Sequence, residues 1–277
     1  MSETNGAPAF PYVHGFSPDE QARLRKQAEF GEPTIYRDVD FSQQKHILEV
    51  GSGVGAQTAI LLRRFPRLRV TCIESSARQI AAAEAYLAGE PYATGRYEIR
   101  RMDAQHLELE GGAFDGAFLC WILEHVPDPA RLLSEVRRVL RPGSPLVVTE
   151  VMNSSFFLEP YSPHMWRYWM AFNDYQHEQA GDPFVGAKLG NLLLSQGYRD
   201  IVTREKVWHL DNREPERRRL AIRFWKELLL SAKDSLLAAK AIDEALVKDM
   251  EREFSEVEAA PDAVFFYAFV QATARVG

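Results

Sequence analysis

The chain has 277 residues, a formal net charge of −6 at pH 7 and two cysteines. Its hydrophobic share of 46% and its charged share of 26% are ordinary for a globular protein. The length suits one α/β domain with an added cap, or two small domains. The acidic balance argues against a nucleic-acid partner, which would require a basic face.

The N-terminus, the apolar runs and the cysteines indicate the cellular compartment of the protein. The N-terminus lacks the positive charge and apolar core of a signal peptide. No apolar run approaches the roughly 20 residues that span a bilayer. Cys72 and Cys120 fall on predicted buried strands, where we interpret them as small apolar core residues in a reducing compartment and not as a disulfide. We therefore expect a cytoplasmic protein without membrane contact, and with no zinc-like Cys/His spacing we expect no metal site.

The first predicted element is a helix after Ser17. Ser17-Pro18-Asp19-Glu20 has the features of a helix start: a capping Ser, Pro at the first position and Glu three residues after the Ser. This helix precedes the first predicted strand. It either folds over a ligand site or merely packs on the sheet.

A glycine-rich turn follows the first strand. An apolar run at 46–48 leads into Glu49-Val50-Gly51-Ser52-Gly53-Val54-Gly55, and a helix is predicted over 56–64. Such a strand, turn and helix receive nucleotide-like ligands in open α/β sheets, because glycines let the backbone approach the ligand. Glu49 would repel a diphosphate but attract an ammonium or sulfonium. The loop therefore suggests a cationic cofactor, although Gly51-x-Gly53-x-x-Ala56 also fits the dinucleotide fingerprint.

The second and third predicted strands are each followed by a carboxylate residue that could contact a ligand. A run at 70–73 ends in Glu74, where a carboxylate can accept both ribose hydroxyls or simply be solvated. A strand over 97–102 ends in Asp103-Ala104, which suit an adenine amine and ring. A fourth run, 114–121, ends in Cys120-Trp121, and Asp128 caps a helix with Pro129 at its first position. A fifth strand is predicted over 145–150.

The second half of the chain is predicted to cover the site. Residues 156–184 are dense in aromatic side chains and too long for a simple connection, so we interpret them as a cap, or else as plain core. A helix over 181–194, a strand over 201–209, helices over 211–232 and 242–254, and a strand over 264–276 follow. The acidic residues beside Arg217-Arg218-Arg219 predict an exposed helix face there.

In this order and spacing, five motifs resemble the class I S-adenosylmethionine-dependent methyltransferases, within the small-molecule, type 11 group that includes ubiquinone and menaquinone enzymes. They are Glu49-x-Gly51-x-Gly53-x-Gly55, Glu74, Asp103-Ala104, Leu123-Glu124-His125-x-x-x-Pro129 and Leu140-Arg141-Pro142-Gly143. The resemblance implies a Rossmann-like, doubly wound α/β sheet, mostly parallel with an antiparallel last strand, plus an N-terminal lid helix and a helical cap. The implied parts are a lid segment (1–35), a cofactor-binding core (36–150), an aromatic cap (151–198) and the end of the sheet with covering helices (199–277).

The resemblance also implies which residues bind the cofactor, S-adenosyl-L-methionine. Its methionine end would meet Glu49 and the loop residues Gly51, Ser52, Gly53 and Gly55, and its ribose would meet Glu74. Its adenine would meet Asp103 and Ala104, with Ser75 and Met102 as neighbours, and Cys120 and Trp121 would form the floor beside the sulfonium. Tyr12 and Gln27 would reach it from the lid.

The predicted reaction is methyl transfer to carbon or oxygen of a small, largely apolar or aromatic metabolite, natural products included. Phe157, Trp166 and Tyr175 on the cap are the predicted substrate contacts. No residue is assigned as general base, and the candidates are His125, His164 and His177. N-methylation of a small amine, an NAD-dependent oxidoreductase and a non-catalytic binder stay open. The N-terminal segment could also dock on a second copy and form a homo-oligomer.

Overall fold

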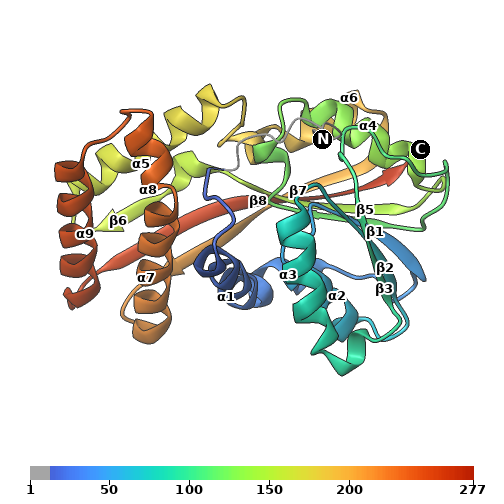
Figure 1. The fold of residues 1–277 in the computed structure, drawn as a ribbon, viewed down its shortest axis with the longest axis horizontal. Coiled ribbons are helices and arrows are strands. Elements are labelled where there is room, and N and C mark those ends of the chain that lie inside the picture. The colour runs from blue at the N-terminus through green and yellow to red at the C-terminus, as the bar shows by residue number, and fades with distance from the viewer. Residues whose placement is uncertain (1–12) are drawn as a thin grey trace, which may run out of the picture.

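The computed structural model describes residues 13–277, so Tyr12 lies outside the described residues. The chain forms a single sheet in the order β3-β2-β1-β4-β5-β8-β6, with β7 on the other edge of β8 (Figure 1). The strands are β1 (His46–Val50), β2 (Arg69–Glu74), β3 (Tyr97–Arg101), β4 (Ala117–Cys120), β5 (Pro145–Val151), β6 (Phe157–Glu159), β7 (Tyr198–Leu210) and β8 (Val264–Val276).

The first five strands are parallel, and β8 is antiparallel to its neighbours. The predicted α/β fold class with an antiparallel last strand is therefore confirmed. β8 pairs with β5 through residues 269–275 and with β6 through residues 264–266. Together with β7 it extends the sheet from the parallel part into the C-terminal helices, across the whole width of Figure 1.

Helices cover both faces of the parallel part. Ile47 belongs to one buried cluster with residues of α2, whereas its neighbours Leu48 and Val50 belong to a second cluster with residues of α4 and α6. This alternation follows from the period of two along a strand. The helices are α1 (Pro18–Ile35), α2 (Ala56–Arg64), α3 (Ala77–Ala88), α4 (Pro129–Val139), α5 (Pro163–Glu178), α6 (Leu189–Ser195), α7 (Pro215–Ser231), α8 (Lys233–Ala238) and α9 (Glu244–Ala259).

The N-terminal helix begins as the sequence predicts. Ser17 Oγ accepts a hydrogen bond from Glu20 N at 3.1 Å, and Pro18 occupies the first helical position. In Figure 1, α1 lies between the parallel part of the sheet and the C-terminal helices. It contacts α2, α7 and β7, which joins both parts of the molecule.

The C-terminal helices form an aromatic layer over β6 and the extended end of β8. Phe156 stacks on Trp225 with ring centroids 5.0 Å apart, and Trp225 contacts Tyr267 at 4.5 Å. The expectation of an exposed face around Arg218 is wrong at that residue, whose side chain is only 1% exposed. Its guanidinium is buried because it donates to the carbonyls of Ala260 and Ala263, which closes the turn into β8.

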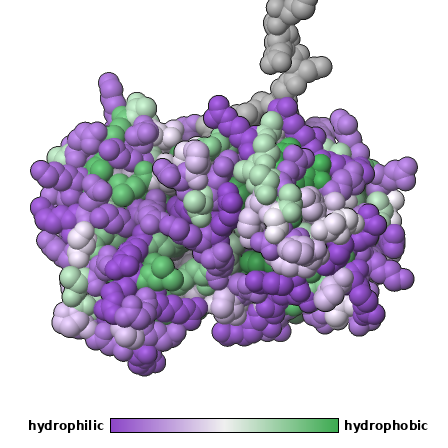
Figure 2. All heavy atoms as spheres, turned by 60° about the horizontal axis from the view of Figure 1, so that its bottom comes forward, coloured by the Kyte–Doolittle hydropathy of each residue, from purple (hydrophilic) through white to green (hydrophobic). Residues whose placement is uncertain are grey.

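The surface in Figure 2 is predominantly hydrophilic, and its hydrophobic side chains form small separate patches. Among residues 13–277, no helix is both long and apolar enough to cross a bilayer. The division into parts at residues 35, 150 and 198 stays a prediction.

Candidate active site

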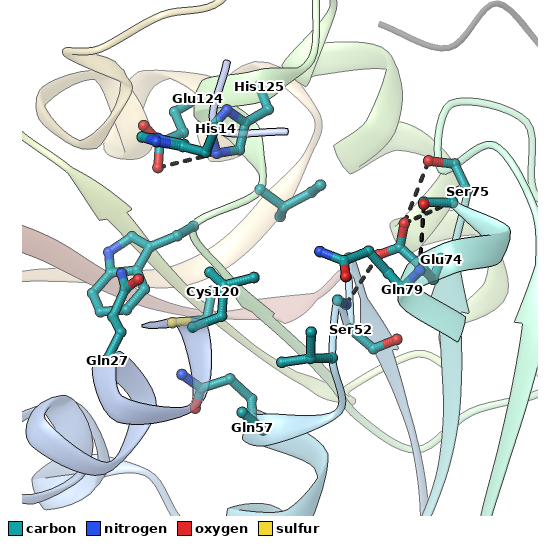
Figure 3. A pocket seen from close by; sticks show the side chains of 18 of the residues that line it. His14, Gln27, Ser52, Gln57, Glu74, Ser75, Gln79, Cys120, Glu124 and His125 are labelled. Carbon is teal, nitrogen blue, oxygen red and sulfur yellow. Dashed lines mark hydrogen bonds and ion pairs between the residues drawn. The ribbon is translucent and has the colours of Figure 1, made fainter. Parts of the chain in front are cut away.

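One cavity of about 1030 Å³ opens where β1, β2 and β4 reach their carboxyl ends (Figure 3). Ligands bind at this edge in open α/β sheets. One half is lined by the loop after β1 and by residues that follow β2 and β3, and the other half is lined by aromatic side chains. We call these the cofactor half and the aromatic chamber. Cys120 and Trp121 line the same cavity.

The backbone of the glycine loop faces the cofactor half. Gly51 has a φ of +72°, and a Cβ on it would lie 2.7 Å from the Ile122 side chain. Gly53 also has positive φ, but a Cβ there would meet nothing within 4 Å, so this backbone borders open space. The Ser52 hydroxyl is buried and has no hydrogen-bond partner among the described residues. A ligand that supplies an acceptor would satisfy it.

Glu49 lies beneath the loop and does not line the cavity. Its Oε2 accepts a hydrogen bond from Thr58 Oγ1 at 2.6 Å, which ties β1 to α2. Burial raises the pKa of Glu49 to about 7. Because the Glu49 side chain does not line the cavity, it is not placed for the expected direct contact with a cationic ligand. Gly55 is also behind the loop, where a Cβ would press on Ala83 and Leu87 of α3.

Glu74 reaches across from β2 to the loop. Its Oε2 accepts from Gly53 N at 2.9 Å, and its Oε1 accepts from Ser76 N at 2.8 Å. Ser75, Met102, Asp103 and Ala104 line the cavity beside it. Asp103 Oδ1 accepts from Gln105 N at 2.8 Å, which fixes the turn after β3. The predicted residues for a ribose and an adenine therefore meet on one wall.

The floor of the cavity is built on a strained residue. Trp121 has a φ of +56°, which is uncommon for a side chain of this size, and its indole packs edge-on against Phe269. Its buried Nε1 has no partner within residues 13–277. Gln27 lines the cavity from α1 and accepts a hydrogen bond from Arg23 at 3.0 Å.

Glu150 holds the loop after β4, a role that the sequence did not suggest. Its Oε1 accepts from Ile122 N at 3.0 Å and from Leu123 N at 2.8 Å. The residue is fully buried, and burial, together with the neighbouring Glu124 carboxylate, raises its pKa to about 8. The sequence feature that could have indicated this role is that Glu150, a carboxylate, ends a strand predicted to be buried.

The aromatic chamber is formed by residues other than the predicted ones. Phe157, Trp166 and Tyr175 do not line the cavity, and Phe157 is 43% exposed on β6. The buried face of α5 runs through Met165, Trp169 and Phe172, so Trp166 and Tyr175 lie off this face. The chamber is lined by Trp169, Phe172, Trp208, Phe224, Trp225, Leu228 and Tyr267.

Of the three candidate histidines, only His125 lines the cavity. His164 lies on the other side of α5, where its Nδ1 is 2.6 Å from Glu253 Oε1, and His177 is exposed in the last turn. His14, which the sequence analysis did not single out, lines the cavity as well. Figure 3 shows His14, Glu124 and His125 together at one end. No group of three or more His, Cys, Asp or Glu side chains suited to a metal occurs in residues 13–277.

The family model described as a methyltransferase domain matches residues 48–148. Residues 48–148 therefore form a domain of the methyltransferase family. The matched segment runs from β1 to β5 and contains the glycine loop, Glu74, Asp103 and the floor at Cys120 and Trp121. It ends before the elements that form the aromatic chamber.

Curated relatives of this chain share about 30% identity with it over the aligned residues. The O-methyltransferase cnsE of Penicillium expansum is 33% identical over 58% of this chain and 54% of its own length. The demethylmenaquinone methyltransferase of Desulfitobacterium hafniense is 31% identical over 38% of this chain and 39% of its own. The chain thus spans about half the length of the first relatives it matches or less.

Solved structures support the methyltransferase fold across nearly the whole chain. Haemonchus contortus phosphoethanolamine N-methyltransferase 2, in complex with S-adenosyl-L-methionine, has a TM-score of 0.56 at 18% identity, covering 89% of this chain and 52% of its own. Geranyl diphosphate C-methyltransferase from Streptomyces coelicolor A3(2) has a TM-score of 0.53 at 15% identity, covering 91% and 78%. At these identities the likeness concerns the fold alone.

Proposed function

We propose that this methyltransferase transfers a methyl group from S-adenosyl-L-methionine to carbon or oxygen of a small, largely apolar or aromatic metabolite, such as a natural product. The observation that carries the proposal is the continuity of the cavity. Its cofactor half and its aromatic chamber share the residues Cys120 and Trp121 as a common border. A donor and an acceptor bound in one cavity can be aligned for in-line displacement.

The cofactor half fits the proposed donor. The Glu74 carboxylate can accept ribose hydroxyls, and the open space at Gly53 and the unpartnered Ser52 hydroxyl suit the polar amino-acid end. When bound, S-adenosylmethionine supplies a methyl group on a sulfonium. The role of Glu49 in this proposal is indirect, because it fixes the start of α2 through Thr58 and so holds the loop.

The aromatic chamber fits an apolar acceptor. Trp169, Phe172 and Trp225 present ring surfaces, and the rings of Trp169 and Phe172 stack with centroids 5.5 Å apart. Binding an apolar ring there removes apolar surface from water. The large aromatic lining also excludes water from the reacting atoms. The relatives named as O-methyltransferases are consistent with transfer to oxygen.

Calorimetry tests the proposal at the cofactor first. We expect binding of S-adenosylmethionine and S-adenosylhomocysteine with Kd values on the order of micromolar, about −8 kcal/mol, and no binding of NAD. Transfer of a labelled methyl group to a panel of aromatic and terpenoid acceptors tests the second half. NAD binding in place of S-adenosylhomocysteine, or transfer only to small hydrophilic amines, would contradict the proposal.

A further inference from the structure

Two glutamine side chains, Gln27 of α1 and Gln57 of α2, line the cavity in the part that Cys120 borders (Figure 3). Each amide oxygen already accepts a hydrogen bond from the protein, whereas neither Nε2 has a partner among residues 13–277. Building on the proposed function, we propose that Gln27 and Gln57 bind the carboxylate of S-adenosylmethionine, and that Tyr36 positions Gln57 for this contact. The two amides would then select the cofactor by its carboxylate.

Tyr36 fixes the direction of the Gln57 amide. Its hydroxyl donates to Gln57 Oε1 at 2.8 Å, and the Tyr36 side chain is only 1% exposed. Burial, then the neighbouring Cys120 and Glu49, raise the pKa of Tyr36 well above its usual value, so the hydroxyl keeps its hydrogen and stays a donor. The Tyr36 ring stacks on Phe118 with centroids 5.5 Å apart, which holds the hydroxyl in place. With its oxygen engaged, the Gln57 amide presents its N–H groups to the cavity.

Arg23 fixes the Gln27 amide in the same way. A guanidinium can only donate, so the Gln27 atom that lies 3.0 Å from Arg23 Nη1 is the amide oxygen. The other two guanidinium nitrogens, Nε and Nη2, donate to the Glu20 carboxylate at 2.7 and 2.6 Å. Glu20 therefore compensates the charge of Arg23. The hydrogen bond from Arg23 also polarises the Gln27 amide, which makes its N–H groups stronger donors.

A carboxylate is the ligand group that suits two amides presenting only N–H groups. It has about four lone-pair positions, so it can accept hydrogen bonds from both side chains at once. An ammonium cannot accept a hydrogen bond, and the positive ends of the N–H groups repel its charge. In S-adenosylmethionine the carboxylate belongs to the amino-acid end. The ammonium and the sulfonium of the same molecule balance its charge, so the protein needs no additional cation there.

The place of the two amides in the cavity matches the amino-acid end of the cofactor. Figure 3 shows Glu74, the expected ribose contact, across the cavity from Gln27 and Gln57. Ser52 of the glycine loop lies between the two sides in this view. Gln57 is the second residue of α2, directly after that loop. A ligand whose ribose meets Glu74 and whose chain follows the loop therefore ends at the two glutamines.

Calorimetry on the full chain with two ligands tests the proposal. The ligands are S-adenosylhomocysteine and its decarboxylated form, which keeps the nucleoside, the sulfur and the ammonium. We expect the wild type to bind S-adenosylhomocysteine at least about tenfold more tightly, because hydrogen bonds to a charged group are lost with the carboxylate. Gln57→Leu should lower the affinity for S-adenosylhomocysteine by about tenfold and leave the affinity for the decarboxylated form unchanged.

Gln57→Glu gives a result of opposite sign for the two ligands. The new carboxylate keeps an oxygen for the Tyr36 hydroxyl, but it places a negative charge against the carboxylate of the ligand. We expect the affinity for S-adenosylhomocysteine to fall by about 100-fold, and the decarboxylated form to become the tighter ligand of the two.

Tyr36→Phe distinguishes positioning of Gln57 from a purely structural role. It keeps the stacked ring and removes the hydroxyl that holds the amide. We expect an affinity for S-adenosylhomocysteine about threefold lower, and no further loss when Tyr36→Phe is added to Gln57→Leu. Gln43→Leu, exposed before β1 and off the cavity, is the control. Thermal unfolding of each ligand-free variant shows whether its fold is kept.

Equal losses for the two ligands in Gln57→Leu would overturn the assignment, and so would full affinity of this variant for S-adenosylhomocysteine. Additive losses from Tyr36→Phe and Gln57→Leu would overturn the role of Tyr36. Should Gln57→Leu not fold, the order of the two ligands in Gln57→Glu decides, and an unchanged order would overturn the assignment. A folded wild type that binds neither ligand would instead overturn the proposed function, so the two failures are distinguishable.

Discussion

Replacing Glu74 tests the cofactor half most directly. Each of its carboxylate oxygens accepts one backbone hydrogen bond, Oε2 from Gly53 N and Oε1 from Ser76 N. A carboxylate has about four lone-pair positions, so both oxygens keep capacity for a ribose hydroxyl while the loop contacts stay. Removing the side chain therefore removes two expected ligand contacts and both backbone hydrogen bonds.

The magnitude follows from the kind of hydrogen bond. Hydrogen bonds to charged groups contribute about 1.5–3 kcal/mol, and Glu74 is partly exposed, so the lower end applies to each. We expect Glu74→Ala to weaken binding of S-adenosylhomocysteine by about 1–3 kcal/mol. Glu74→Gln keeps one acceptor oxygen and should lose about 1 kcal/mol.

The assay is calorimetry with S-adenosylhomocysteine, with thermal unfolding of each ligand-free variant measured alongside. Glu98→Gln is the control, because Glu98 is exposed on β3, pairs with Arg100 and does not line the cavity. An unchanged Kd in both Glu74 variants would refute the reasoning. Glu74 would then serve only to hold the glycine loop.

Three further predictions concern the chamber, the N-terminal segment and pH. Trp169→Phe should weaken binding of an apolar acceptor by about 1 kcal/mol, which is measured as a higher KM. Trp166→Phe, on the same helix but off the cavity, should leave KM unchanged, and equal effects of the two changes would contradict the chamber lining. Deleting residues 1–30 should lower turnover at least about tenfold and leave a folded domain, and full activity of the truncated protein would show that the segment is no lid. The pKa of Glu150 is about 8 in the folded protein against 4.5 as its ordinary value, so its contribution to stability is full below pH 4.5 and is lost as the pH rises to about 8. In urea unfolding at pH 5 and pH 8, the wild type should lose up to about 4 kcal/mol more unfolding free energy than Glu150→Gln; equal pH dependence in both proteins would count against it.

The cofactor half was largely predictable because its residues follow strands in sequence order. Gly51, Glu74 and Asp103 end neighbouring parallel strands, and the carboxyl ends of parallel strands meet at one edge. The bounds predicted for the helix at 56–64 agree with α2. The sequence analysis placed the Glu49 side chain against the cofactor, although the alternation of side chains along β1 indicates that it points toward α2. It shares a face with Ile47, which packs among residues of α2, so its side chain points at that helix.

The aromatic chamber was not predictable in the same way, because it depends on the phase of one helix and on long-range pairing. Residues 163–178 carry aromatic side chains in several directions, and only packing decides that Trp169 faces the cavity while Trp166 does not. Trp208 and Tyr267 reach the chamber because β7 and β8 pair side by side. His14 meets His125 only through the tertiary fold, since no local pattern links them.

The extended sheet also bears on how an acceptor enters. β7 and β8 are each 13 residues long and carry Trp208 and Tyr267 to the chamber, so one hydrogen-bonded sheet joins the chamber to the parallel part of the fold. A hinge between the two parts would have to break this sheet. Within residues 13–277, the N-terminal side of the cavity is joined to the opposite side by single hydrogen bonds, which include Val13 O with Ser235, His14 with Ser231, and Gln21 with Gln79. At about 1 kcal/mol each, breaking them costs far less than opening the sheet. We therefore expect acceptors to enter beneath the N-terminal segment, and the deletion of residues 1–30, which removes this segment together with the first part of α1, should impair turnover.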